Sequence, residues 1–150
     1  MKLFIALYTL MIPVTLNVFS QVNEDDICGY WFTENNEAII KITKNGDNTF
    51  SGMFCWLLEP NEPDSTNANF GNPIIDQHTG IPYLQTIILR DAVYAETGKW
   101  KGGIYDPRHG TTYKCNISLS ENSQTMTLKG YIGISLLGKK IIWTRTCSCQ

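Results

Sequence analysis

The chain has 150 residues, of which 43% are hydrophobic, and it carries 12 Lys and Arg residues against 14 Asp and Glu residues. This length suits a single domain that can bury a sizeable core. The formal net charge of −2 and the scattered basic residues disfavour nucleic acid and anionic membrane surfaces as partners.

The first 20 residues predict a secretory signal peptide. A basic residue precedes an apolar run at 3–16, and Val18 and Ser20 occupy the third and first positions before the predicted cleavage site. No later apolar run approaches the roughly 18 residues that cross a bilayer, so we expect no transmembrane segment in the mature chain. Residues 21–150 would then form one exported domain, periplasmic or extracellular.

The mature chain predicts short β-strands separated by turns, and helical periodicity is hard to find. Residues 38–43 alternate between apolar and polar side chains, and Asn45–Asn48 (NGDN) is a strong hairpin signal. Residues 111–119 also alternate, with Tyr113 and Cys115 on the apolar face. The eight predicted strands span residues 28–32, 38–43, 49–58, 84–96, 99–105, 111–119, 125–132 and 140–147.

One long stretch, residues 59–83, lacks a periodic pattern. It contains four prolines and six asparagine or aspartate residues. Structureless connections of this length in compact domains are usually lids, binding loops or disordered segments. We therefore interpret residues 59–83 as a long loop beside a site.

Eight short, mostly hairpin-connected strands must hide their edges, which favours a closed barrel or a two-sheet sandwich. In a closed barrel the first and last strands are neighbours. Trp31 on the first and Arg145 on the last would then meet, and the guanidinium would lie across the indole as a structural plug. The sequence thus predicts an all-β protein with an eight-stranded antiparallel up-and-down barrel.

The segment WKGGIYDPRHGTTY (Trp100–Tyr113) joins two predicted strands through the turn Asp106–Gly110. Pro107 suits the second position of a type I turn, and Gly110 can adopt the positive φ that returns the chain to the ladder. We interpret it as a hairpin turn with Arg108 exposed at its tip. The alternative is a polar rim at a barrel mouth.

Two resemblances follow from these residues. The Trp31 and Arg145 arrangement resembles the calycin superfamily of lipocalins, fatty-acid-binding proteins and avidins. Nearly the whole mature chain is similar to domain-of-unknown-function family 2147, exported bacterial proteins with a lipocalin-like barrel and no established activity. The chain departs from that family at 69–76, which lacks an arginine-rich stretch and has Asp76 in place of glycine. The motif residues are Trp100, Gly102, Gly103, Tyr105, Asp106, Pro107, Gly110, Tyr113 and Trp143.

The chain has five cysteines, so at least one lacks an intramolecular partner. If Trp31 pairs with Arg145, Cys28 lies opposite position 148, and a disulfide from Cys28 to Cys147 or Cys149 would tie the ends of the chain. Cys55 and Cys115 fall on strands that are not neighbours. We expect both as buried thiols rather than as a bridge across the lumen.

The sequence contains no catalytic, metal-binding or cofactor-binding pattern, so we expect a protein that is not an enzyme. His78 and His109 both fall in turn-like segments. Our leading hypothesis is a small apolar or amphipathic ligand held in the barrel lumen, with residues 59–83 as a lid. The alternative is an interaction module with a filled barrel and an unspecified protein partner. The predicted lumen residues are Phe54, Trp56, Ile88, Tyr113, Ile117 and Leu128.

Overall fold

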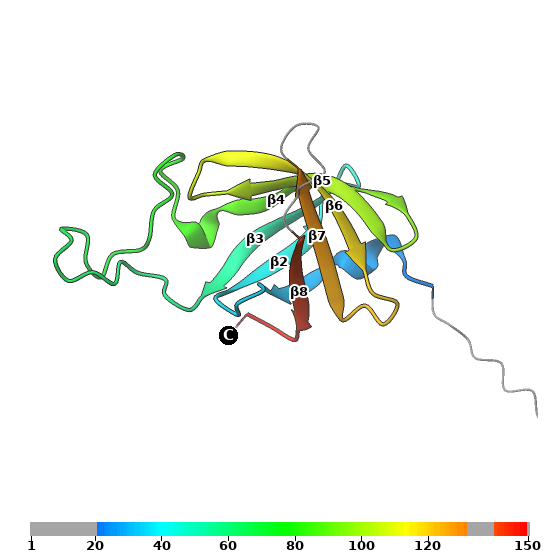
Figure 1. Ribbon diagram of the computed structural model, residues 1–150, viewed down its shortest axis with the longest axis horizontal. Helices are drawn as coiled ribbons and strands as arrows, with labels where there is room; N and C mark the ends of the chain where they lie inside the picture. Colours follow the sequence, from blue (N-terminus) through cyan, green and yellow to red (C-terminus); the bar gives the residue numbers. More distant parts are fainter. Residues whose placement is uncertain (1–20, 132–139, 150) are drawn as a thin grey trace, which may run out of the picture.

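The computed structural model describes residues 21–131 and 140–149, which form a closed barrel of eight antiparallel strands in chain order (Figure 1). This confirms the predicted all-β barrel. The predicted signal peptide at 1–20 lies outside the described residues. The strands are β1 (Gly29–Phe32), β2 (Ala38–Lys44), β3 (Phe50–Leu57), β4 (Ile87–Glu96), β5 (Lys99–Asp106), β6 (Thr111–Leu119), β7 (Thr125–Tyr131) and β8 (Lys140–Thr146).

Period-two alternation places one face of each strand in the barrel interior. Along β6, Cys115, Ile117 and Leu119 are buried while Lys114 and Asn116 are exposed. This is the pattern of a sheet with one packed side and one solvated side. Inward-facing residues of this kind build the interior of the barrel, and register shifts in the β2–β3, β3–β4 and β4–β5 pairs interrupt the alternation.

The β2–β3 hairpin forms at the predicted turn. The backbone N–H of Asn45 donates to the carbonyl of Thr49 (2.7 Å), and Asn48 has a φ of 62°. Asparagine tolerates this left-handed conformation better than most residues. Local turn chemistry thus fixes where β2 ends and β3 begins.

The closed end of the barrel is sealed by Trp31 and Arg145. The two residues are paired between β1 and β8, and the guanidinium carbon lies 4.2 Å from the indole ring centroid. The predicted contact is therefore present. Arg145 also donates to the carbonyls of Cys28 (2.9 Å), Ser123 (2.6 Å) and Asp26. These bonds satisfy a cation that would otherwise be costly to half-bury.

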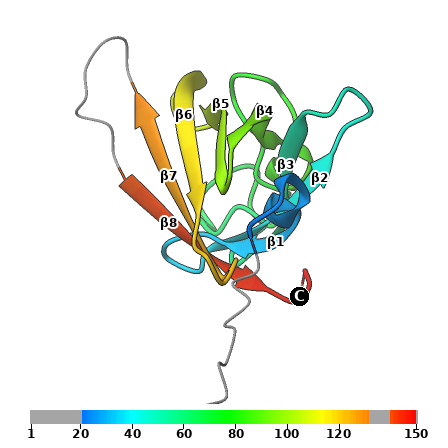
Figure 2. The ribbon, with the colours of Figure 1, turned by 90° about the vertical axis from the view of Figure 1, so that its right-hand side faces the viewer.

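A short 3₁₀ helix, η1 (Glu24–Ile27), lies across this end, in front of the strands in Figure 2. The indole N–H of Trp31 donates to the carbonyl of Ile27 (2.9 Å), and Ile27 is fully buried. The N-terminal segment thus completes the closed end of the barrel.

Two glycines of β5 accept a close approach of neighbouring strands. A Cβ atom at Gly102 would lie 2.8 Å from the Cα of Ala92, and one at Gly103 would lie 2.8 Å from Thr112. The β4–β5 register shifts between Arg90 and Val93. A shift of this kind bends the strand and brings backbones together. The glycine pair thus leaves room for the backbone of β4 and for the side chain of Thr112 on β6.

The predicted disulfide is wrong. Cys149 is bonded to Cys55, with their Cα atoms 5.9 Å apart, and Cys28 and Cys147 are free thiols. The β1–β8 ladder ends at the pair Tyr30 and Thr146, so Cys28 is not held opposite the residues that follow β8. The C-terminal residues instead reach β3.

The expectation of a buried thiol fails for Cys55 but holds for Cys115. Burial raises the pKa of the Cys115 thiol to about 11. A thiol with such a pKa stays protonated at neutral pH and packs as a small apolar side chain. Cys115 is therefore part of the barrel interior.

The predicted loop at 59–83 divides into two parts. Residues 60–73 form an arm that projects away from the barrel in Figure 1, closed by a bridge between Asn61 and Pro73. Residues 74–86, here called the strap, return to the barrel and include the 3₁₀ helix η2 (Tyr83–Gln85). A second bridge, between Ile75 and Pro82, closes the strap.

Candidate functional site

A cavity of about 940 Å³ occupies the end of the barrel opposite the Trp31–Arg145 seal. Its walls come from β2 to β8 and its mouth from the β1–β2 and β5–β6 turns and the strap. The apolar and aromatic side chains of the wall are Ala38, Phe54, Leu57, Tyr83, Ile88, Ile104, Tyr105, Tyr113, Cys115, Leu128, Ile141 and Trp143.

Four of the predicted lumen residues, Phe54, Ile88, Tyr113 and Leu128, line this cavity. The prediction of Ile117 as a lining residue is wrong. It is fully buried in the packed core, paired with Trp100 and Leu128 on the neighbouring strands. The alternating pattern of β6 predicted that Ile117 faces the barrel interior. It could not show how much of that interior is filled by the packed core.

Trp56 does not line the cavity either, because β3 carries an extra residue. The β2–β3 register shifts so that Ile40 pairs with Phe54 and Ile39 with Trp56. Cys55 is the unpaired residue of this bulge. Beyond it, positions of β3 that would otherwise face the barrel interior face outward, and the reverse. Trp56 instead meets Phe32 edge-to-face, with ring centroids 6.2 Å apart, and Leu57 takes the lining position.

Sequence reasoning missed two lining residues on β8, Ile141 and Trp143. They stand two positions apart, so alternation along the strand places them on one face. That signal was present in the sequence. Leu57, by contrast, became a lining residue only through the bulge at Cys55.

The mouth of the cavity is polar. Glu34 and Glu37 lie on the β1–β2 side, and Asp106 and Arg108 lie at the β5–β6 turn. The carboxylate of Asp106 is 2.8 Å from Nδ1 of His109 and accepts a hydrogen bond from the backbone N–H of Arg108 (3.0 Å). Although burial raises the pKa of Asp106, these two contacts lower it overall. The predicted turn is thus also part of a polar rim.

Asp76 is fully buried beside the cavity. Its carboxylate accepts hydrogen bonds from the hydroxyl of Tyr105 (2.7 Å), the hydroxyl of Thr79 (2.7 Å) and the backbone N–H of His78 (2.9 Å). Burial acts to raise the pKa of Asp76, but these hydrogen bonds lower it overall. The guanidinium carbon of Arg90 lies 4.1 Å from the centroid of the Tyr105 ring.

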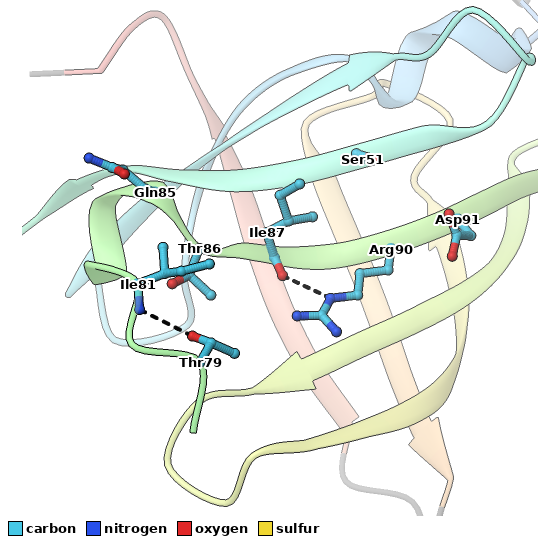
Figure 3. A pocket seen from close by; sticks show the side chains of 8 residues that line it. All are labelled: Ser51, Thr79, Ile81, Gln85, Thr86, Ile87, Arg90 and Asp91. Atoms are coloured by element: carbon cyan, nitrogen blue, oxygen red, sulfur yellow. Dashed lines mark hydrogen bonds between the residues drawn. The ribbon is translucent and has the colours of Figure 1, made fainter. Parts of the chain in front are cut away.

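A smaller groove of about 330 Å³ lies between the strap and the strands β3 and β4 (Figure 3). Thr79 and Ile81 line it from the strap, and Ser51, Arg90 and Asp91 line it from β3 and β4. Arg90 Nε donates to the carbonyl of Ile87 (3.1 Å) across the groove floor. The strap therefore has open space on this side rather than a packed contact.

A floor sealed by Trp31 and Arg145 below an open cavity is the geometry that the calycin resemblance implied. The family described as "Uncharacterized protein conserved in bacteria (DUF2147)" matches residues 29–145. The chain belongs to the DUF2147 family. No curated protein is significantly similar to this chain.

A solved structure has a fold similar to that of this chain. It is the structure of protein HP1028 from the human pathogen Helicobacter pylori, which is described as belonging to the lipocalin family. It matches this chain with a TM-score of 0.61 and 16% sequence identity. The match covers 83% of this chain and 84% of that one. At this identity the likeness establishes a lipocalin-like fold.

The DUF2147 motif residues serve different parts of the barrel. Tyr105, Asp106, Pro107, Tyr113 and Trp143 line the cavity, whereas Trp100 is buried in the core. Gly110 has a φ of 62°, as its predicted place in the turn requires, and a Cβ there would lie 2.5 Å from the ring of His78. The motif thus joins the cavity wall to the strap.

Within residues 21–131 and 140–149, no three His, Cys, Asp or Glu side chains gather as a metal site would require. In the same residues, no helix has the length and hydropathy needed to cross a membrane. The geometry of the cavity is therefore the main functional observation that this DUF2147 chain offers.

Proposed function

We propose that the barrel binds a small apolar or amphipathic molecule in its cavity. The observation that carries the proposal is the cavity of about 940 Å³ with apolar and aromatic walls. Ligand sites in proteins are typically concave, roughly 300–1,000 Å³ in volume, and lined mainly by apolar side chains with a few polar groups. The alternative of a filled barrel acting as an interaction module is disfavoured by the same volume.

The distribution of polar groups supports an orientation for the ligand. Phe54, Ile88 and Leu128 belong to the wall, and Glu34 and Arg108 belong to the mouth. An amphipathic molecule would bury its apolar part against the wall and leave its polar part at the rim, because unpaired polar groups are costly to bury.

The proposed role is binding without catalysis. Asp106 lines the mouth of the cavity, and its carboxylate lies within hydrogen-bond distance (2.8 Å) of Nδ1 of His109 in the β5–β6 turn. The His109 side chain is 69% exposed. A catalytic pair needs a site that excludes water around the reacting atoms, which this exposed turn does not supply.

We also propose that the protein works after export, in the periplasm or outside the cell. The Cys55–Cys149 disulfide supports this location, because disulfides form and persist in oxidising compartments. The signal-peptide pattern at 1–20 supports the same location. N-terminal sequencing of the protein from its natural source tests this point, with Gln21 expected as the first residue.

Titration with 1-N-phenylnaphthylamine, a neutral apolar fluorophore, tests the binding proposal. A Cβ at Gly130 would lie 3.9 Å from the side chains of Ile104 and Tyr113, which both line the cavity. Gly130→Trp would therefore fill part of the cavity. Lys129→Trp is the matched control, since Lys129 is the exposed neighbour on the same strand.

We expect saturable binding by the wild type and by Lys129→Trp. Binding by Gly130→Trp should be about tenfold weaker, which corresponds to roughly 1.4 kcal/mol of lost contact. Absence of saturable binding by the wild type, or equal affinity of the two variants, contradicts the proposal. Circular dichroism of each variant establishes that the barrel is folded.

A further inference from the structure

The strap, residues 74–86, is the only part of the predicted lid that reaches the cavity among the described residues. It does so through Tyr83, whose ring stacks on that of Phe54 with centroids 6.0 Å apart and planes 7° from parallel. Both rings line the cavity. Tyr83 is thus a piece of cavity wall supplied by a segment outside the barrel.

The strap is held in shape by its own backbone hydrogen bonds. The N–H of Asp76 donates to the carbonyl of Ile81 (2.9 Å), and the N–H of Tyr83 donates to the carbonyl of Ile74 (3.0 Å). A contact that holds Asp76 in place therefore also restrains Tyr83 through these two backbone hydrogen bonds.

Asp76 connects this unit to the barrel. Of the three donors to its carboxylate, Thr79 and His78 belong to the strap itself, whereas Tyr105 lies on β5. A buried, charge-assisted hydrogen bond is among the stronger ones in proteins. The hydroxyl of Tyr105 is therefore the strap's strongest polar attachment to the strand that it faces.

Other contacts between strap and barrel are weaker or lie at its edges. The N–H of Phe54 donates to the carbonyl of Thr86 (3.3 Å) where the strap ends, and the ring of His78 rests against Gly110. The groove of about 330 Å³ shown in Figure 3 separates part of the strap from β3 and β4. The strap thus depends on few attachments.

We propose that Asp76 is a positioning residue of the binding site: its hydrogen bond to Tyr105 anchors the strap so that Tyr83 is held against Phe54 as part of the cavity wall. This inference rests on the proposed function, because it assigns a role in ligand retention. It restricts the predicted lid from residues 59–83 to the strap, and it leaves the projecting arm out of the site.

A double-mutant cycle tests the proposal with the same fluorophore, 1-N-phenylnaphthylamine. Tyr105→Phe removes the anchoring hydroxyl and keeps the ring in the wall. Thr79→Val is the matched control, because it removes another 2.7 Å hydrogen bond to the same Asp76 oxygen but leaves the strap attached to β5. Tyr83→Ala removes the side chain through which the anchor is proposed to act.

We expect Tyr105→Phe to raise the Kd about tenfold, mainly through faster dissociation, as loss of a hydrogen bond to a buried charge would. Thr79→Val should change the Kd by less than about twofold, and Tyr105→Phe should add less than about twofold when Tyr83 is already Ala. An equal effect of Tyr105→Phe in both backgrounds shows a direct role of Tyr105 and overturns the proposal. An unchanged Kd overturns it as well.

Amide hydrogen exchange separates this proposal from the binding proposal. Residues 77–86 should exchange faster in Tyr105→Phe than in Thr79→Val, whether or not the fluorophore binds. Equal exchange in the two variants overturns the anchoring role. Failure of the wild type to bind the fluorophore, with the exchange difference present, removes the proposed function and leaves the anchor in place.

Discussion

The closed and open ends of the barrel use the same strands in different ways. At the closed end, Trp31, Phe50 and Met126 are fully buried in a continuous core, and Arg145 donates a hydrogen bond to the carbonyl of Asp26 in η1. At the open end, equally apolar side chains such as Phe54 and Ile104 are only partly buried and border a cavity. We therefore expect the closed end to contribute more to the stability of the barrel than the open end, where the proposed ligand would bind.

The largest expected effect is the loss of Trp31. Trp31→Ala should lower the free energy of unfolding by about 3–5 kcal/mol, because it opens a void in a packed core and removes the partner of Arg145. Phe54→Ala should cost less than about 2 kcal/mol, since one side of that ring already faces a cavity. Urea denaturation of both variants measures the difference, and equal losses would refute the division into two halves.

The disulfide should rank second. Cys55→Ser/Cys149→Ser should lower the free energy of unfolding by about 2–4 kcal/mol, because the bond closes a loop with a sequence separation of 94. Cys147→Ser is the control, since Cys147 is an exposed free thiol and should change little. The fluorophore affinity of both variants should equal that of the wild type. A loss of affinity in the double variant alone would place the disulfide in the binding site.

Gly102→Ala should destabilise the protein by about 1–3 kcal/mol through overpacking, because its Cβ would meet the backbone of Ala92 and Arg90. Gly46→Ala in the β2–β3 turn is the matched change, since nothing lies within 4 Å of a Cβ there. It should stay within about 0.5 kcal/mol of the wild type. Thermal unfolding compares the two, and similar melting temperatures would mean that β4 can move away from β5.

The smallest expected effect is on the pH dependence of stability, through Asp76 beside the cavity. Because the pKa of Asp76 is lowered by its hydrogen bonds in the folded protein, its ionised form favours folding above the ordinary pKa of 3.8. This contribution is lost as the pH falls through the lowered value. Asp76→Asn should therefore lose less stability than the wild type between neutral pH and about pH 3. Parallel acid-unfolding curves would contradict this assignment.

Local patterns predicted most of the barrel. β6 has the predicted bounds of 111–119 because a clean alternation is flanked by strong turn signals. β4 begins at Ile87 rather than at Leu84, because Tyr83–Gln85 turn into η2 after Pro82. Closure made the first and last strands neighbours, and the expected pairing of Trp31 with Arg145 is present.

The site was less predictable because it depends on long-range pairing. The bulge at Cys55 puts Leu57 rather than Trp56 in the cavity wall. The disulfide joins Cys55 on β3 to Cys149 in the segment that follows β8. No local pattern marks either feature. The volume of the cavity depends on how far the side chains of seven strands, β2 to β8, fill the barrel. The proposed anchoring role of Asp76 depends on its contact with Tyr105, which is 29 residues away in the sequence.

Native mass spectrometry of the protein purified from the organism that produces it would show whether the cavity holds a ligand. We expect a mass that exceeds that of the polypeptide by one small molecule, which is released on denaturation. The fraction of protein that carries this molecule should be lower for Gly130→Trp than for the wild type, and unchanged for Lys129→Trp. A wild-type spectrum that contains the polypeptide mass alone would contradict this expectation.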